Sequence, residues 1–220
     1  MATTTATRRL AAILAADVVG YSRLMGVDEE GTHERVKAQL AELIDPKIRE
    51  HRGRIVKTTG DGVLAEFASV VDAVRCAGEI QRAMADRDLD LAEERRLRFR
   101  IGVNLGDVIA DGDDIYGDGV NIAVRLEGLA APGGVCVSGT VRDHIGDRLP
   151  YPFEDMGEQS VKNIARPVRV YALRPEGVAG AAPAHMQSTA SHPSPSAVPG
   201  VDRRAAVRQS QQRPGAAILR

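Results

Sequence analysis

One apolar run near the amino terminus constrains the fold more than any other feature of the sequence. Residues 10–16 are Leu-Ala-Ala-Ile-Leu-Ala-Ala, and Asp17 follows directly. The length of the run and the turn signal in Val18-Val-Gly20 predict a buried strand. No apolar run anywhere in the sequence approaches the roughly 20 residues of a membrane helix, so we expect no membrane segment. Asp17 then stands at the carboxyl end of a core strand.

A second carboxylate, Asp61, lies in the tight turn of a predicted hairpin. Strand patterns cover residues 54–58 and 62–67, and glycines flank Asp61 where a tight turn often needs positive φ. Two carboxylates at neighbouring strand ends can hold a divalent cation against phosphate oxygens, because hard cations prefer oxygen ligands. Each aspartate has a structural alternative, Asp17 as an N-cap and Asp61 as an ordinary turn residue. The metal hypothesis requires the two strand ends to be neighbours.

Helix and strand patterns alternate along the rest of the chain. Helical spacing of apolar residues predicts helices over residues 28–52, 69–88, 117–130 and 140–145. Short or alternating apolar patterns predict strands over residues 97–109, 135–137, 153–164 and 168–173. Asp28 and Ser69 are candidate N-caps, and Pro46 predicts a kink or a restart inside the first helix. The alternation predicts an α/β or α+β sandwich, in which helices cover one mixed sheet.

Composition separates a folded body from its ends. The 220 residues suit one domain plus an appendage, and the net charge of −1 gives no argument for a nucleic-acid partner. Residues 177–220 hold five Pro, ten Ala and no aromatic residue, so we expect a disordered tail over residues 175–220. We expect residues 1–7 to form a flexible leader. Cys76 and Cys136 lack metal-ligand spacing, which favours buried free thiols in a reducing cytoplasm.

A later segment adds polar groups of other kinds. It is Asp114-Ile-Tyr-Gly-Asp-Gly-Val-Asn121-Ile-Ala-Val-Arg125, and Lys57 lies four residues before Asp61 in the strand that enters the turn. Asn121 and Arg125 share one helix face because they are four residues apart. The alternative for this pair is a solvent-facing position, and for Lys57 a solvated position on an edge strand. Together, these side chains suit a site for a nucleoside triphosphate.

Taken together, the motifs resemble the catalytic domain of the class III nucleotidyl cyclases, the adenylyl and guanylyl cyclase family, over residues 8–174. They occur in the family's order and at its approximate spacing: Ala16-Asp17-Val18-Val19-Gly20-Tyr21-Ser22, Lys57-Thr-Thr-Gly60-Asp61, Arg100-Ile-Gly-Val-Asn104-Leu-Gly106, Asp114-Ile-Tyr-Gly117 and Val120-Asn121-Ile-Ala-Val-Arg125-Leu126. The resemblance implies a mixed, mostly antiparallel, ferredoxin-like sheet covered by helices.

The resemblance also implies a role for each site residue. Asp17 and Asp61, with the carbonyl of Val18, would bind two divalent cations, Mg²⁺ or Mn²⁺. These cations would activate the ribose 3′-hydroxyl and help pyrophosphate to leave. Asn121 would orient the ribose, and Arg125 would stabilise the charge that develops at the α-phosphate.

Further residues would contact the base and the phosphates. In the family's pattern Lys57 donates to a ring nitrogen, and Asp114 accepts from the exocyclic amine of adenine. Guanine has a carbonyl at that place, which a carboxylate would repel, so the pair favours ATP over GTP. Neighbouring Asp113 leaves a one-residue alternative for Asp114. Lys162 corresponds to a lysine that contacts the triphosphate.

The family assembles its active site across a head-to-tail dimer, so the resemblance implies a homodimer with composite sites. One chain supplies Asp17 and Asp61, and the other supplies the base-contacting pair with Asn121 and Arg125. We therefore expect a cytoplasmic adenylate cyclase that converts ATP to 3′,5′-cyclic AMP and pyrophosphate in signal transduction. The alternatives are a guanylate cyclase and a non-catalytic nucleotide-sensing dimerisation module. A diguanylate cyclase is disfavoured because the sequence lacks a Gly-Gly-Asp/Glu-Glu-Phe signature.

Overall fold

The computed structural model describes residues 7–173, with gaps at residues 88, 90–92, 94–95, 163 and 165. The expected disordered tail, residues 175–220, lies outside the described residues. So does the expected leader, except that Thr7 is already the first residue of a strand. The folded body within residues 7–173 carries every predicted site residue.

The strands of this body form one sheet. They are β1 (Thr7–Val18), β2 (Gly53–Thr58), β3 (Gly62–Phe67), β4 (Phe99–Asp111), β5 (Asp114–Tyr116), β6 (Val135–Ser138), β7 (Phe153–Gln159) and β8 (Val168–Leu173). Their order is β2-β3-β1-β4-β6-β8-β7, and β5 pairs with β4 outside this path. All pairings among the described strands are antiparallel, except that of β4 with β6. The mixed, mostly antiparallel sheet confirms the predicted fold class.

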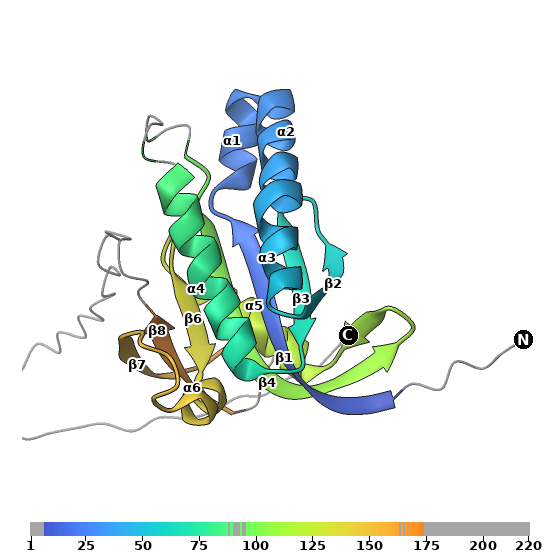
Figure 1. Cartoon of the computed structure of the whole chain (residues 1–220), viewed down its shortest axis with the longest axis vertical. Helices are drawn as coiled ribbons and strands as arrows, with labels where there is room; N and C mark the ends of the chain where they lie inside the picture. The colour runs from blue at the N-terminus through green and yellow to red at the C-terminus, as the bar shows by residue number, and fades with distance from the viewer. Residues whose placement is uncertain are drawn as a thin grey trace, which may run out of the picture. The chain divides into compact units, whose positions relative to one another are not determined.

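Helices cover both faces of the sheet. They are α1 (Tyr21–Val27), α2 (Glu29–Gln39), the π-helical segment η1 (Leu40–Ile44), α3 (Asp45–Glu50), α4 (Val70–Arg87), α5 (Asp118–Leu129) and α6 (Gly139–Ile145). Figure 1 shows α1 to α4 in front of the sheet and α5 behind it. None of these described helices is long and apolar enough to cross a membrane.

The central strand β1 is buried on both of its faces. Ala12, Leu14 and Ala16 belong to the hydrophobic cluster that contains residues of α2, α3 and α4. The alternate residues, Ala11, Ile13 and Ala15, belong to a second cluster with residues of α5. Because successive side chains of a strand point to opposite faces, a strand that is covered on both sides needs a continuous apolar run. The predicted buried strand is therefore confirmed.

The predicted helix over residues 28–52, with a kink or a restart at Pro46, corresponds to α2, η1 and α3 in succession. A separate helix, α1, precedes Asp28 and was not predicted. Asp28 ends α1 and caps α2, because its Oδ1 accepts a hydrogen bond at 3.0 Å from the backbone amide of Gly31. The helical path then passes through η1 into α3, where Pro46 lies in the first turn. Proline has no N–H group and is tolerated there. Of the predicted kink or restart, the structure has a new helical segment that begins one residue before Pro46. Helix α3 ends at Glu50, and Gly53 already belongs to β2.

Two further strands differ from the prediction. The strand expected over residues 153–164 ends at Gln159. Strand β5 was not predicted, because its three residues are too few to show an alternating pattern. The predicted cap of α4 is present, since the hydroxyl of Ser69 accepts from the amide of Asp72 at 3.2 Å.

Gly102 lets α5 lie directly on the backbone of β4. A Cβ atom on Gly102 would be 2.2 Å from both the carbonyl oxygen of Ala123 and the amide nitrogen of Glu127. A side chain larger than that of glycine therefore does not fit between the strand and the helix. This contact sets the height of α5 above the sheet, and α5 carries Asn121 and Arg125.

Candidate active site

The two predicted metal carboxylates come from elements that meet at one end of the sheet. β1 is antiparallel to β3, and the register places Asp17 opposite Gly62, the residue after Asp61. The Val18 amide donates to the Asp61 carbonyl at 3.2 Å, so the β2–β3 turn lies against the end of β1. Gly60 has a φ of 79° in that turn, a value that favours glycine. The strand end and the turn are neighbours as expected, although β1 pairs with β3 and β2 is the edge strand.

Arg100 binds the Asp17 carboxylate from the neighbouring strand. It lies opposite Asp17 on β4 and donates from Nε to Oδ1 at 3.0 Å and from Nη2 to Oδ2 at 2.6 Å. Its Nη2 is also 3.3 Å from Oε1 of Glu127 on α5. Bidentate arginine–carboxylate pairs of this kind are strong and geometrically specific. β1, β4 and α5 therefore contribute charged groups to one cluster.

Sequence reasoning does not identify Arg100 and Glu127 as members of the site. Arg100 and its partner Asp17 are separated by 83 positions, and only the strand pairing brings them together. The sequence does indicate that Glu127 is unusual. It lies four residues after Ala123 and three before Ala130, on the apolar stripe of its helix. A charged residue on such a stripe is buried, and the Glu127 side chain is only 10% exposed.

The groups of this cluster shift one another's ionisation. Burial raises the pKa of the Glu127 carboxyl well above its usual value, and contact with Asp17 raises it further. Hydrogen bonding with Asp17 raises the pKa of the Arg100 guanidinium, which remains positively charged. Arg100 therefore supplies the positive charge beside Asp17, while Glu127 favours its neutral form.

The carboxylate oxygens at this end of the sheet are the kind of ligand that a hard divalent cation prefers, and both oxygens of Asp17 here accept hydrogen bonds from Arg100. Asp17 and Asp61 offer carboxylate oxygens, and Val18 follows Asp17 at the same strand end. Mg²⁺ and Mn²⁺ prefer oxygen ligands, and Mg²⁺ is usually held by one or two carboxylates together with substrate phosphates. Within the described part of the chain, no set of three or more His, Cys, Asp or Glu side chains is arranged to hold a metal ion. A cation at this place would need substrate oxygens to complete its coordination.

Lys57 and Asp114 form the second group of predicted site residues. Nζ of Lys57 is 2.9 Å from Oδ1 and 3.0 Å from Oδ2 of Asp114, and it lies 5.3 Å from the centre of the Tyr116 ring. Oδ1 of Asp114 also accepts from the Ile115 amide at 2.8 Å. Hydrogen bonding with Lys57 holds the pKa of the Asp114 carboxyl below its usual value, so the group is ionised at neutral pH. The partner of Lys57 is thus Asp114, and not its neighbour Asp113.

The remaining predicted residues are exposed. Asn121 and Arg125 lie on the outer face of α5, and within the described part of the chain their side chains make no hydrogen bond or ion pair. They take the solvent-facing position that was the alternative for this pair, and they do not meet the other groups within one chain. Lys162 lies in the connection between β7 and β8 and is exposed as well.

The hairpin that carries Asp114 lies at the far end of β4 from Arg100, but its partner Lys57 lies close to the carboxylate cluster. Lys57 is opposite Leu64, and Leu64 is opposite Ala15, two residues before Asp17. β4 has Arg100 opposite Asp17 near its start, and Asp111 opposite Asp114 at its end. Figure 1 shows the β4–β5 hairpin at the other end of β1 from α1. The contact with Lys57 therefore brings the Asp114 carboxylate toward the end of the sheet that carries Asp17 and Asp61.

Comparison with known proteins identifies the family of this chain. The family described as the adenylate and guanylate cyclase catalytic domain matches residues 5–175, and the chain belongs to this family. The putative adenylate cyclase 3 of Rhizobium meliloti (strain 1021) is 50% identical over 169 residues. That match covers 77% of this chain and 29% of the relative, so the chain spans less than a third of that protein's length.

Solved structures show the same fold. The adenylate/guanylate cyclase/hydrolase from Silicibacter pomeroyi is 50% identical, with a TM-score of 0.75 over 78% of this chain and 100% of its own. The adenylyl cyclase CyaB from P. aeruginosa is 23% identical, with a TM-score of 0.68 over 77% of this chain and 96% of its own. The guanylyl cyclase Cya2 is also 23% identical, with a TM-score of 0.67 over 76% of this chain and 93% of its own. The fold is thus common to enzymes named for either nucleotide.

Proposed function

We propose that the chain is an adenylate cyclase, which converts ATP to 3′,5′-cyclic AMP and pyrophosphate. Its family supports a nucleotide cyclase. The choice of ATP rests on one observation, the ion pair in which Lys57 contacts both carboxylate oxygens of Asp114. This pair presents a cationic donor and an anionic acceptor side by side.

The Lys57–Asp114 pair suits the edge of adenine. The ionised Asp114 carboxylate is an acceptor only, and it pairs with the exocyclic amine of adenine while Lys57 donates to a ring nitrogen. Guanine carries a carbonyl in place of that amine, so two acceptors would face each other. A site that hydrogen-bonds one substrate group rejects the analogue that lacks it, because its own polar groups are then left unpaired.

The reaction itself depends on positioning and on charge. Asn121 orients the ribose so that its 3′-hydroxyl faces the α-phosphate. Arg125 stabilises the negative charge that develops there in the transition state, and Lys162 contacts the triphosphate. Two divalent cations, held by Asp17, Asp61 and the Val18 carbonyl, would supply Lewis acidity to the hydroxyl and to the leaving pyrophosphate.

Each site is built from two copies of the chain in this proposal. The exposed Asn121 and Arg125 support it, because their side chains face solvent and form no hydrogen bond or ion pair with the described residues of their own chain. A homodimer has two equivalent sites. The buried free thiols Cys76 and Cys136 support a reducing, cytoplasmic setting.

The test measures cyclic nucleotide and pyrophosphate release from ATP and from GTP, with Mg²⁺ or Mn²⁺, beside the Asp17→Ala/Asp61→Ala variant. Cyclic AMP from the wild type alone is the expected result. Cyclic GMP as the main product would identify a guanylate cyclase. Binding of ATP without release of either product, over protein concentrations that rule out a weak dimer, would identify a nucleotide-sensing module.

Single substitutions separate the roles within the site. Asp114→Asn adds an amide donor and should raise turnover of GTP relative to ATP, whereas Asp113→Asn changes the neighbouring exposed carboxylate and is the matched control. Arg125→Ala should lower kcat by roughly 10²–10³-fold with little change in KM, as for loss of a donor to a developing oxyanion. Full activity of Arg125→Ala would remove Arg125 from the proposed mechanism.

A further inference from the structure

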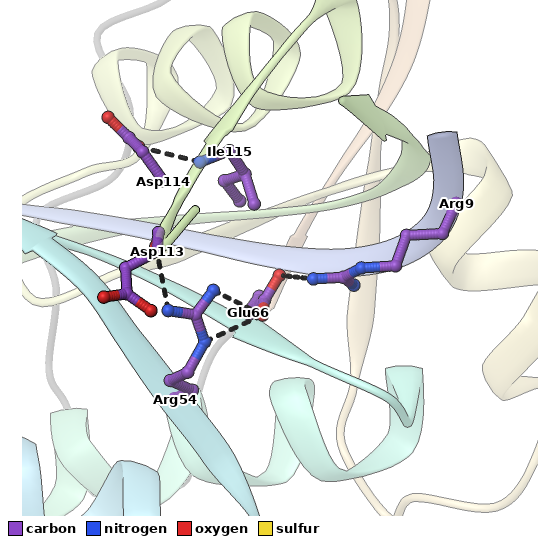
Figure 2. Close-up of polar contacts among 6 residues, drawn as sticks. All are labelled: Arg9, Arg54, Glu66, Asp113, Asp114 and Ile115. Atoms are coloured by element: carbon purple, nitrogen blue, oxygen red, sulfur yellow. Dashed lines mark hydrogen bonds and ion pairs between the residues drawn. The ribbon is translucent and has the colours of Figure 1, made fainter. Parts of the chain in front are cut away.

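A buried carboxylate links four segments near the Lys57–Asp114 pair. Glu66 lies on β3 opposite Arg54 of β2 and Ile13 of β1, and its side chain is only 11% exposed. Its Oε2 accepts from Nη2 of Arg9 at 2.5 Å, and its Oε1 accepts from Nε and Nη2 of Arg54 at 3.0 and 2.8 Å (Figure 2). A carboxylate among apolar neighbours is stable only when it is paired and hydrogen-bonded, and two guanidinium groups satisfy this one.

Arg54 uses its remaining nitrogen to hold the turn of the β4–β5 hairpin. Its Nη1 donates to the backbone carbonyl of Asp113 at 2.8 Å, as Figure 2 shows. That turn joins Asp111 to Asp114, which are opposite each other in the hairpin. Glu66 fixes the plane of the guanidinium, so the third donor is aimed at one place. The carbonyl that it binds belongs to the residue directly before Asp114.

An irregularity in β2 brings Lys57 to the same side of the sheet. Arg54 is opposite Glu66, but the register shifts between Ile55 and Lys57, so that Lys57 is opposite Leu64. Glu66 and Leu64 are two residues apart and therefore share one face. A β-bulge of this kind redirects a side chain. Arg54 and Lys57 thus both project toward the hairpin, although they are three positions apart and would point to opposite faces of a regular strand.

Two cross-links therefore join β2 to the β4–β5 hairpin. Among the described residues, the side-chain hydrogen bonds between these elements are those from Arg54 to Asp113 and from Lys57 to Asp114. The second link consists of the groups that contact the base in the proposed function. The hydrogen bond from Arg54 to Asp113 can therefore hold the hairpin in place while Lys57 and Asp114 bind a nucleotide.

We propose that Arg54, oriented by Glu66, is a positioning residue that fixes the β4–β5 turn and thereby sets the preference for adenine over guanine. This inference rests on the proposed function, in which Lys57 and Asp114 contact the base. Arg54 itself touches neither the base nor the reacting atoms. It acts through the main chain of Asp113, which determines where the Asp114 carboxylate stands.

Arg54→Lys and Arg9→Lys are a matched pair of variants for the test. Lysine keeps the positive charge beside Glu66 but lacks the planar fork that binds Glu66 and the Asp113 carbonyl together. Arg9 is the other partner of Glu66, and its side chain makes no hydrogen bond to the described residues of the turn, so the same substitution there controls for the loss of a guanidinium. Thermal unfolding first verifies that both variants are folded.

Two measurements read out the position of the hairpin without requiring turnover. Hydrogen exchange of residues 108–116 should quicken in Arg54→Lys and stay as in the wild type in Arg9→Lys. The ratio of dissociation constants for ribose-labelled fluorescent GTP and ATP should fall about five- to tenfold in Arg54→Lys, the factor for loss of one ordinary hydrogen bond. It should change less than about twofold in Arg9→Lys, because the link from Arg54 to the turn remains.

The outcomes separate this inference from the proposed function. Unchanged hairpin exchange in Arg54→Lys, or faster exchange with an unchanged binding ratio, would overturn the positioning role. A wild type that binds the ATP analogue tightly without turnover would refute the catalytic proposal alone. A wild type that binds both analogues equally would refute the base contact and this inference with it.

Discussion

Replacing Gly102 with alanine would push α5 away from the sheet that supports it. The new methyl carbon would lie 2.2 Å from the Ala123 carbonyl oxygen and the Glu127 amide nitrogen, and 2.9 Å from the Glu127 Cα. Ordinary van der Waals contact begins near 3.4 Å. The helix must therefore move by about 1.2 Å, or β4 must distort by as much, because backbone atoms cannot rotate out of the way.

The size of the effect follows from this displacement. Overpacking a buried site costs about 1–3 kcal/mol, and a clash with backbone belongs at the upper end of that range. Alanine also reduces the entropy of the unfolded chain, which offsets about 0.4–1 kcal/mol. We expect the free energy of unfolding to fall by about 2 kcal/mol. Asn121 and Arg125 move with α5, so the cyclase rate should fall by roughly 10²-fold, the effect of a misplacement of about 1 Å.

Urea unfolding followed by far-UV circular dichroism measures the stability, and cyclic AMP formation measures the rate. Gly128→Ala is the control on the same helix, because a Cβ at Gly128 meets nothing within 4 Å. That substitution should raise the free energy of unfolding by about 0.5–1 kcal/mol through helix propensity. If Gly102→Ala were as stable and as active as the wild type, the close contact between α5 and β4 would not be what positions the helix.

Two other predictions concern the core. Nε2 of Gln81 donates to the carbonyls of Phe99 and Gly134 at 3.0 and 2.9 Å. Gln81→Met would remove both hydrogen bonds, so the free energy of unfolding should fall by about 1–3 kcal/mol. An unchanged urea midpoint would contradict this prediction. Burial raises the pKa of both the Cys76 and Cys136 thiols to about 12. Because the thiolate is the nucleophile, a disulfide reagent at pH 8 should label neither cysteine in the native protein and both cysteines in denaturant. Rapid labelling of either cysteine in the native protein would contradict this prediction, because it would show that the thiol is accessible.

Local patterns in the sequence predict the elements whose signals are long or chemically distinct. The continuous apolar run of β1 predicts burial, and both faces of that strand are covered. The helix pattern over residues 69–88 corresponds to α4, with the hydroxyl of Ser69 as its cap. α1 and β5 were not predicted because they have only seven and three residues, and the periodic pattern of apolar residues is recognisable only in longer segments.

The sequence by itself determines which side chains are available for chemistry and roughly which elements carry them. Asp17 and Asp61 stand out because each lies at an apolar run, whereas the roles of Lys57 and Asp114 come from the resemblance to the family's motifs. The family match then assigns the class of enzyme.

Only the tertiary structure decides which of these groups meet. The strand register pairs Asp17 with Arg100, which is 83 positions away, and the β4–β5 hairpin brings Asp114 to Lys57, which is 57 positions away. It also buries Glu127 beside Arg100 and ties Arg54 to the turn before Asp114. Propensity and spacing act over a few residues, whereas these contacts arise from strand pairing and helix packing across the whole sheet, so no local pattern in the chain contains them.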